Sequence, residues 1–99
     1  MEEIVEKLYS EAINAVRTGK LDEWLKDNAI LEALEGGGDG SLFEYSALIY
    51  ASREMEVEFI VEEQVGLRII RGEDVEAKEF PPDVAIAIIK HFAHANMFR

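Results

Sequence analysis

The sequence predicts an α+β fold: two N-terminal helices, an antiparallel sheet of about four strands and a buried C-terminal helix. Three observations support it. Apolar residues recur at helical spacing at both ends of the chain. A glycine-rich segment at 36–40 interrupts the chain after its first third. Acidic and apolar residues alternate from Glu54 to Phe59, which is the period of a strand with one polar face. We expect a single domain over residues 1–99.

Two helices are predicted in the helical part, residues 1–35, over 2–18 and 21–35. Gly19 is a suitable end for the first helix. Each helix has one apolar face, formed in the first by Ile4, Val5, Leu8, Tyr9, Ala12, Ile13 and Val16, and in the second by Leu21, Trp24, Leu25, Leu31 and Leu34. The glycines of 36–40 cost too much backbone entropy for a helix, so a flexible joint is expected there.

The sheet is predicted to occupy residues 42–80, with strands over 42–51, 54–63, 65–71 and 75–80. The first of these is ambiguous, because Ser41 and Glu44 match a helical capping box. Its aromatic and β-branched residues favour a strand instead, and a strand extends the meander that follows. Gly66 and Gly72 mark turns.

A C-terminal helix is predicted over 83–97, following Pro81 and Pro82. Six consecutive apolar residues run from Val84 to Ile89, and Lys90 is the single formal charge between 84 and 98. A helix that is apolar on all sides must be covered on most of them. One sheet face covers only part of such a helix, so we expect an extensive, intertwined homodimer.

The chain is strongly acidic, with a formal net charge of −11 from 21 acidic and 10 basic residues. This balance disfavours direct binding to nucleic acid or to an anionic membrane, and it attracts basic proteins and divalent cations. The alternative is that the charge serves only solubility. The absence of cysteine excludes disulfides and thiolate chemistry. Without a signal peptide or membrane span, a cytoplasmic location is expected. The low Asn and Gln content agrees with a thermophilic source.

The candidate partner-binding residues are five carboxylates in and after the second predicted strand. Glu54, Glu56 and Glu58 are expected on one strand face about 7 Å apart, twice the rise per residue. Glu62 and Glu63 follow them, which completes the set Glu54, Glu56, Glu58, Glu62 and Glu63. Like charges on one face repel, so they need neutralisation. A basic partner and cations are two possible sources of it, and pairing with Arg53, Arg68 or Arg71 within the chain is the third.

A metal site is the second candidate, at His91 and His94. The two residues are three apart on the predicted C-terminal helix, so their side chains share a face. Two histidines at this spacing hold a metal when Asp or Glu completes the shell. The alternative is that one histidine lies near the helix C-terminus and the other is hydrogen-bonded at an interface. We nominate no catalytic residue and expect no cofactor.

In size, acidity, lack of cysteine and helix–sheet–helix order, the chain resembles small acidic archaeal proteins of uncharacterised function. Some of these proteins form heavily intertwined homodimers, which is what the resemblance implies here. It covers the whole chain and rests on no motif, so no site residue transfers. The sequence therefore favours a non-enzymatic acidic homodimer that docks a basic protein. A small metal-dependent enzyme or metal-binding protein at His91 and His94, and a purely structural protein, are the alternatives.

Overall fold

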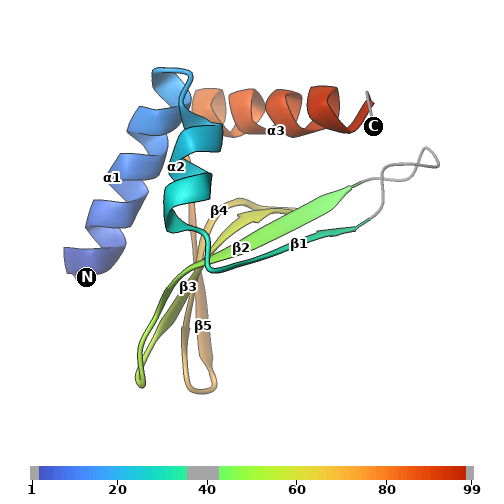
Figure 1. Cartoon of the computed structure of the whole chain (residues 1–99). Coiled ribbons are helices and arrows are strands. Elements are labelled where there is room, and N and C mark those ends of the chain that lie inside the picture. The colour runs from blue at the N-terminus through green and yellow to red at the C-terminus, as the bar shows by residue number, and fades with distance from the viewer. Residues whose placement is uncertain (1–2, 36–42, 98–99) are drawn as a thin grey trace.

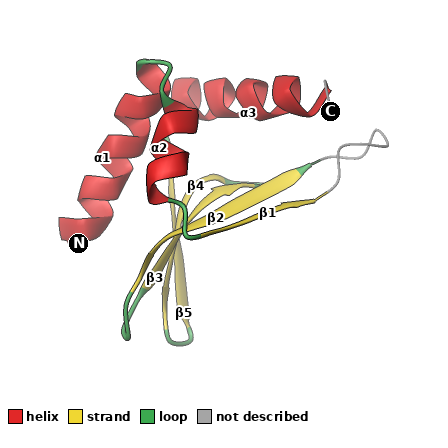
Figure 2. Ribbon diagram, viewed as in Figure 1, coloured by secondary structure: helices red, strands yellow, loops and turns green. Residues whose placement is uncertain are grey.

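The computed structural model describes residues 3–35 and 43–97, and it is an α+β structure. Three helices lie against one face of a five-stranded antiparallel sheet (Figures 1 and 2). The joint predicted at 36–40 lies outside the described residues. The elements are α1 (Glu3–Arg17), α2 (Leu21–Asn28), β1 (Leu31–Glu35), β2 (Glu44–Ala51), β3 (Glu56–Val61), β4 (Val65–Arg71), β5 (Asp74–Glu79) and α3 (Pro82–Met97).

The sheet is a simple meander in which every strand pairs with its neighbour in the chain, in the order β1-β2-β3-β4-β5. All four pairings are antiparallel. A register irregularity between Leu48 and Tyr50 interrupts the β2–β3 ladder, and such bulges bend and twist the strand that carries them. The β2–β3 and β4–β5 hairpins extend well past the helices (Figure 1).

The predicted helix over 21–35 is wrong in its second half, and this error accounts for the fifth strand. Helix α2 ends at Asn28, whose side-chain amide donates a hydrogen bond to the carbonyl oxygen of Trp24. Ala29 is already extended, with φ −72° and ψ 124°. Residues 31–35 then pair with β2, although Leu, Glu and Ala favour a helix locally. Tertiary pairing therefore overrides local propensity in β1.

The ambiguous segment 42–51 is a strand from Glu44 onwards, and 65–71 matches β4. The strand predicted over 54–63 is shorter at both ends, because β3 spans Glu56–Val61. Before it, the Ser52 side chain accepts hydrogen bonds from the backbone N–H groups of Glu54 and Met55, which forms a turn. Glu54 therefore lies outside the strand face that was predicted to contain it.

The core lies between the helices and the covered face of the sheet. Phe59 is 0% exposed and lies at its centre, with ring centroids 5.7 to 6.2 Å from those of Trp24, Tyr45 and Phe80. The same face of β3 and β4 contributes Val57, Val61, Val65, Leu67 and Ile69. This packing draws side chains from helices and strands distant in sequence into one hydrophobic cluster.

The helix layer is joined to the end of the sheet by polar contacts. The Tyr9 hydroxyl donates a hydrogen bond of 2.6 Å to the Glu79 carbonyl oxygen, and Lys78 Nζ lies 4.5 Å from the centre of the Tyr9 ring. Arg17 at the end of α1 reaches Asp83 at the start of α3, with an N–O distance of 3.4 Å. These contacts orient α1 and α3 relative to each other.

Helix α3 is buried along one side in the single chain, which matches the expectation that one sheet face covers only part of it. Val84 and Ile88 are 1% and 0% exposed, whereas Ile86 and Ile89 are 53% and 43% exposed. The helix extends beyond α1 and α2, with its outer side turned away from the sheet (Figure 1). None of the helices in the described part of the chain has both the length and the apolar character needed to cross a membrane.

Candidate functional site

The helices of residues 3–35 and 43–97 all lie on one face of the sheet, and they leave the opposite, uncovered face free (Figure 1). Because side chains alternate along each strand, the strand register determines which residues lie on it. Glu35 and Glu44 lie at one end, Glu58 and Arg68 in the centre, and Glu56 towards the other end. Arg68 is the one base among the strand residues that the register places on this face. The uncovered face is therefore acidic.

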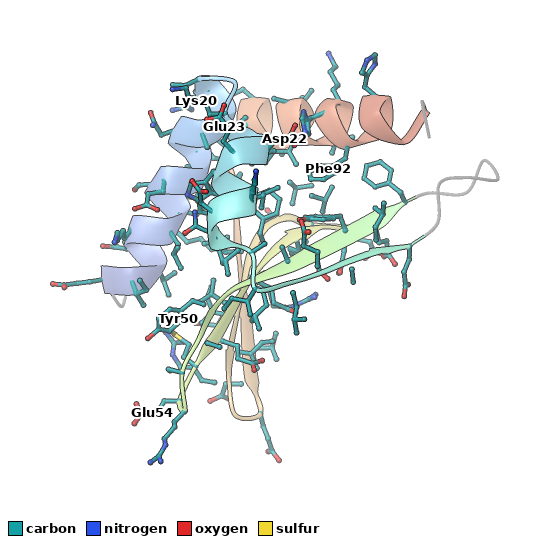
Figure 3. All side chains as sticks on the ribbon, viewed as in Figure 1. Lys20, Asp22, Glu23, Tyr50, Glu54 and Phe92 are labelled. Carbon is teal, nitrogen blue, oxygen red and sulfur yellow. The ribbon has the colours of Figure 1, made fainter. Side chains whose placement is uncertain are left out.

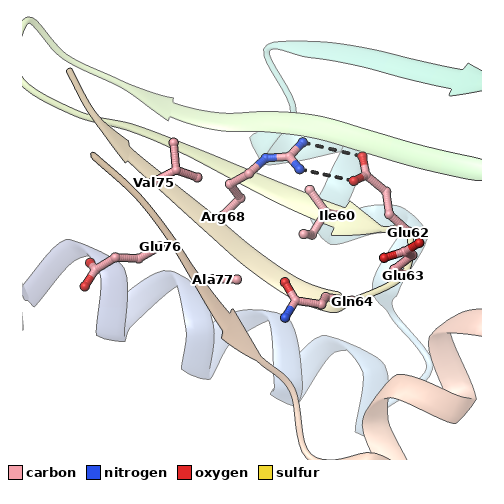
Figure 4. A pocket seen from close by; sticks show the side chains of 8 residues that line it. All are labelled: Ile60, Glu62, Glu63, Gln64, Arg68, Val75, Glu76 and Ala77. Carbon is pink, nitrogen blue, oxygen red and sulfur yellow. Dashed lines mark hydrogen bonds and ion pairs between the residues drawn. The ribbon is translucent and has the colours of Figure 1, made fainter. Parts of the chain in front are cut away.

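Arg68 binds two carboxylates of the uncovered face at once, and Figure 4 shows its contact with one of them, Glu62. Its Nε donates to Glu58 at 2.7 Å, and its Nη1 and Nη2 donate to the two oxygens of Glu62 at 3.1 and 3.4 Å. The hydrogen bonds to Glu62 above all, and then those to Glu58, raise the pKa of Arg68 above its ordinary value, against the opposing effect of its partial burial. Glu58 therefore has an arginine partner within the chain, as the pairing alternative predicted. The same arginine also binds Glu62, so one positive charge offsets two carboxylates.

A hollow of about 410 Å³ lies beside this ion pair, between β3 and β5. Ile60 forms an apolar part of its wall together with Val75 and Ala77, and Glu62 and Arg68 border it (Figure 4). Ile60 is only 2% exposed, although it lies on the face away from the helices. The hollow therefore combines apolar walls with a charged rim, the usual composition of a surface that takes a side chain from a partner.

Two further carboxylates face each other across the β1–β2 pairing. Glu35 lies directly opposite Glu44, and a cavity of about 180 Å³ beside them is lined by Ala33, Ser46 and Glu62 as well. Neither carboxylate forms an ion pair with a described residue, and the connecting segment 36–42 contains no Lys or Arg. Like charges directly opposite each other in a sheet are destabilising. This end of the uncovered face therefore carries unneutralised repulsion.

The five predicted carboxylates are spread along the whole of β3. Glu54 lies in the β2–β3 turn, at the tip that points away from the helices (Figure 3). Glu56 is exposed on the uncovered face, and Glu63 is exposed in the turn after β3. Of the five, the structure brings Glu58 and Glu62 together, through Arg68. Sequence reasoning missed Glu35 and Glu44, because residue 35 was assigned to a helix.

The two histidines of the predicted metal site are part of α3. His91 Nε2 lies 2.8 Å from Asp22 Oδ1 of α2, so a contact between helices already engages it. His94 is exposed on the same helix. Within residues 3–35 and 43–97, no three His, Asp or Glu side chains gather closely enough to hold a metal ion. The metal site stays a prediction, and its two histidines need a ligand from elsewhere.

The chain matches no protein-family model, no curated protein and no solved structure. Its function is therefore inferred from the geometry and charge of the uncovered face.

Proposed function

We propose that this protein is a non-enzymatic acidic homodimer that docks a basic protein partner on the uncovered face of its sheet. The observation that carries the proposal is the cross-strand pair Glu35 and Glu44, which share one end of that face and form no ion pair with a described residue. A lysine or arginine from a partner would relieve the repulsion between these two carboxylates. It would therefore bind with a more favourable free energy than at an isolated carboxylate.

The rest of the uncovered face supports the same partner chemistry. Glu56 and Glu63 are exposed and form no ion pair with a described residue, so they are available to basic groups. The hollow beside Ile60 offers apolar surface to the stem of a long basic side chain. A surface of this kind steers a basic partner during encounter, and the attraction weakens as salt screens it.

The homodimer is proposed on the exposed apolar surface of α3. Ile86 and Ile89 lie on the outer side of a helix that carries one formal charge between 84 and 98. A second copy would remove this surface from water, which is the usual reason for a surface of this composition. Sedimentation across a range of concentrations tests the dimer, and a folded monomer at all of them would contradict it.

The docking site is tested with Glu35→Gln/Glu44→Gln and a lysine-rich peptide as probe. Binding is measured by titration calorimetry at low and at physiological salt. We expect the affinity to fall on the order of tenfold at low salt, since two partly exposed charge pairs at about 0.7 kcal/mol each sum to about 1.4 kcal/mol, which corresponds to tenfold. The wild-type affinity itself should fall steeply with added salt.

The matched control is Glu3→Gln/Glu6→Gln, which removes two exposed charges from α1 and leaves the sheet intact. It separates a local site from the effect of net charge alone. Equal losses in the two variants would show that the peptide senses only the overall charge, and the docking site would be wrong. Glu58 is unsuitable for this experiment, because its replacement also changes the Arg68 ion pair.

The natural partner is identified by capture from the native lysate at low salt, followed by elution with a salt gradient and mass spectrometry. We expect a stoichiometric basic protein that binds the wild type and the Glu3→Gln/Glu6→Gln control. Retention of the same protein by Glu35→Gln/Glu44→Gln would place its docking surface elsewhere.

A further inference from the structure

We infer that the homodimer, on whose existence this inference rests, forms through an antiparallel pairing of α3 with α3 of a second copy. The surface is the outer stripe of the helix, defined by Ile86, Ile89, Lys90 and Ala93. These residues follow the spacing of one helical face. They lie opposite Val84 and Ile88, which face the core.

The outer stripe differs from the other exposed apolar positions in its surroundings. Ile30 and Val75 are as exposed as Ile86, at 59% and 60% against 53%. Ile30 and the more exposed Leu31, at 69%, however, lie at the start of β1, which carries Glu32 and Glu35, and Val75 lies on the acidic uncovered face of the sheet. From Val84 to Met97 the chain contains no acidic residue. Within its own helix, the outer stripe therefore has one acidic neighbour, Asp83 in the first turn.

This difference in surrounding charge indicates which molecule covers the outer stripe. Two copies, each with a formal net charge of −11, oppose carboxylates to carboxylates when they approach through the sheet. They avoid that repulsion when they approach through α3. A basic partner gains nothing from this helix, because it would meet Lys90 and no acid beyond Asp83. A second copy of the chain is thus the partner that fits the stripe.

The helix is also complementary to itself in the antiparallel orientation. Asp83 and Lys90 are about two turns apart and lie on the same flank of the stripe. A two-fold axis beside Ile86 brings the Lys90 of each copy to the Asp83 of the other, with Ile86 packed against its own counterpart. Asp83 remains accessible for this contact, since its side chain is 69% exposed even with Arg17 beside it.

The first test is Ile86→Glu/Ile89→Glu in the full chain, with Ile30→Glu/Val75→Glu as the matched control. Both variants place two carboxylates at exposed apolar positions, so both should keep the wild-type circular dichroism spectrum. We expect the first to weaken dimerisation by on the order of a hundredfold, because like charges would meet across the two-fold axis. The control should sediment as the wild type does.

The second test uses the absence of cysteine from the chain. Ile86→Cys introduces a single thiol beside the proposed axis, where two copies of it lie within reach of a disulfide. Oxidation should convert this variant into a covalent dimer much faster than Val75→Cys, and without loss of the native spectrum.

The inference is overturned if Ile86→Glu/Ile89→Glu remains as dimeric as the wild type, or if Ile86→Cys and Val75→Cys cross-link at equal rates. In either case the dimer itself stands and its interface lies elsewhere. A wild-type chain that is monomeric at every concentration overturns both the dimer and this interface. Binding of the lysine-rich peptide to the sheet is measured separately and decides the docking site on its own.

Discussion

The two faces of the sheet are formed by the same strands, yet different interactions fill them. The covered face is apolar, with Phe59, Leu67 and Val57 each at 0% exposure beneath the helices. The uncovered face buries one large apolar side chain, Ile60, and places the ion pairs of Arg68 beside it. The covered face therefore derives its stability from burial, and the uncovered face has its charges arranged within reach of solvent.

This difference indicates which face is under structural constraint. A charge on the covered face would lose its water without gaining a partner, so that face has room for little but hydrocarbon. The uncovered face tolerates carboxylates even where they repel, as at Glu35 and Glu44. Surplus like charge contributes nothing to the fold, and that is why we place the partner there.

The largest expected effect comes from deleting packing on the covered face. Phe59→Ala should lower the free energy of unfolding by about 3–5 kcal/mol, because it opens a cavity among three other aromatic rings. Ile60→Ala, on the uncovered face, should cost about 2 kcal/mol, since its surroundings can collapse or admit water. Urea denaturation measures both. Equal losses would mean that the two faces are packed alike.

The next effect tests how closely β5 approaches β4. A Cβ atom at Gly66 would lie 2.2 Å from the Lys78 carbonyl oxygen, so the two strands would have to separate. We expect Gly66→Ala to destabilise the protein by about 3 kcal/mol. Gly72→Ala is the control: its φ of +60° disfavours alanine, but no atom lies within 4 Å, so the cost should be about 1 kcal/mol. The reverse order would contradict the close approach.

A smaller effect is expected from removing the guanidinium of the uncovered face. Arg68→Met keeps most of the side-chain volume but leaves Glu58 and Glu62 beside each other without a cation. Because these groups are about a quarter exposed, at 25–28%, the loss should be about 1–2 kcal/mol and not the full cost of a buried charge. Arg53→Met in the exposed β2–β3 turn should be neutral within about 0.5 kcal/mol. Thermal unfolding of both variants at low and high salt checks the difference.

The smallest effect at neutral pH concerns a side-chain contact between the neighbouring strands β2 and β1. The Tyr45 hydroxyl donates a hydrogen bond of 2.5 Å to Glu32, and Tyr45→Phe should cost about 1 kcal/mol. Burial first, and then the bond to Glu32, raise the pKa of Tyr45 above its ordinary value. Below about pH 10 the hydroxyl is protonated in both the folded and the unfolded chain, so its contribution to the free energy of unfolding is constant. Above about pH 10 the unfolded chain loses this proton first, and the free energy of unfolding falls as the pH rises.

The variant removes this titration, so the stability of Tyr45→Phe should decline less than that of the wild type between about pH 10 and 11. Chemical denaturation over that range compares the two proteins. Parallel curves would show that the hydroxyl titrates alike in the folded and unfolded chains.

The comparison of faces also explains what the sequence could predict. Alternation from Glu56 to Phe59 correctly assigned Val57 and Phe59 to one face of a strand and Glu56 and Glu58 to the other. Periodicity likewise located α1 and α3, because each has an apolar side that the core requires. It failed at residues 31–35, where all five residues of β1 are exposed. A strand with no buried face leaves no alternation to detect, and its composition is that of a helix.

The candidate site was predictable to the extent that it lies on one strand. The pairing of Arg68 with Glu58 follows from adjacent strands, and pairing of this arginine was among the expected alternatives. The pairing of Glu35 with Glu44 depends on β1 and on its register, neither of which has a signal in the sequence. A contact between two elements can be predicted only when the sequence pattern assigns both elements correctly. Where it misassigns one of them, the contact is found only in the structure.

The order of the strands has a consequence for the folding rate. Because β2, β3 and β4 each pair with the next strand in the chain, this part of the sheet assembles from hairpins that close short loops. The contacts of α1 with the end of the sheet, from Tyr9 to Glu79, and with α3, from Arg17 to Asp83, join residues 70 and 66 positions apart in the chain. We expect the β3–β4 hairpin to be native-like in the folding transition state and the docking of α1 to follow it.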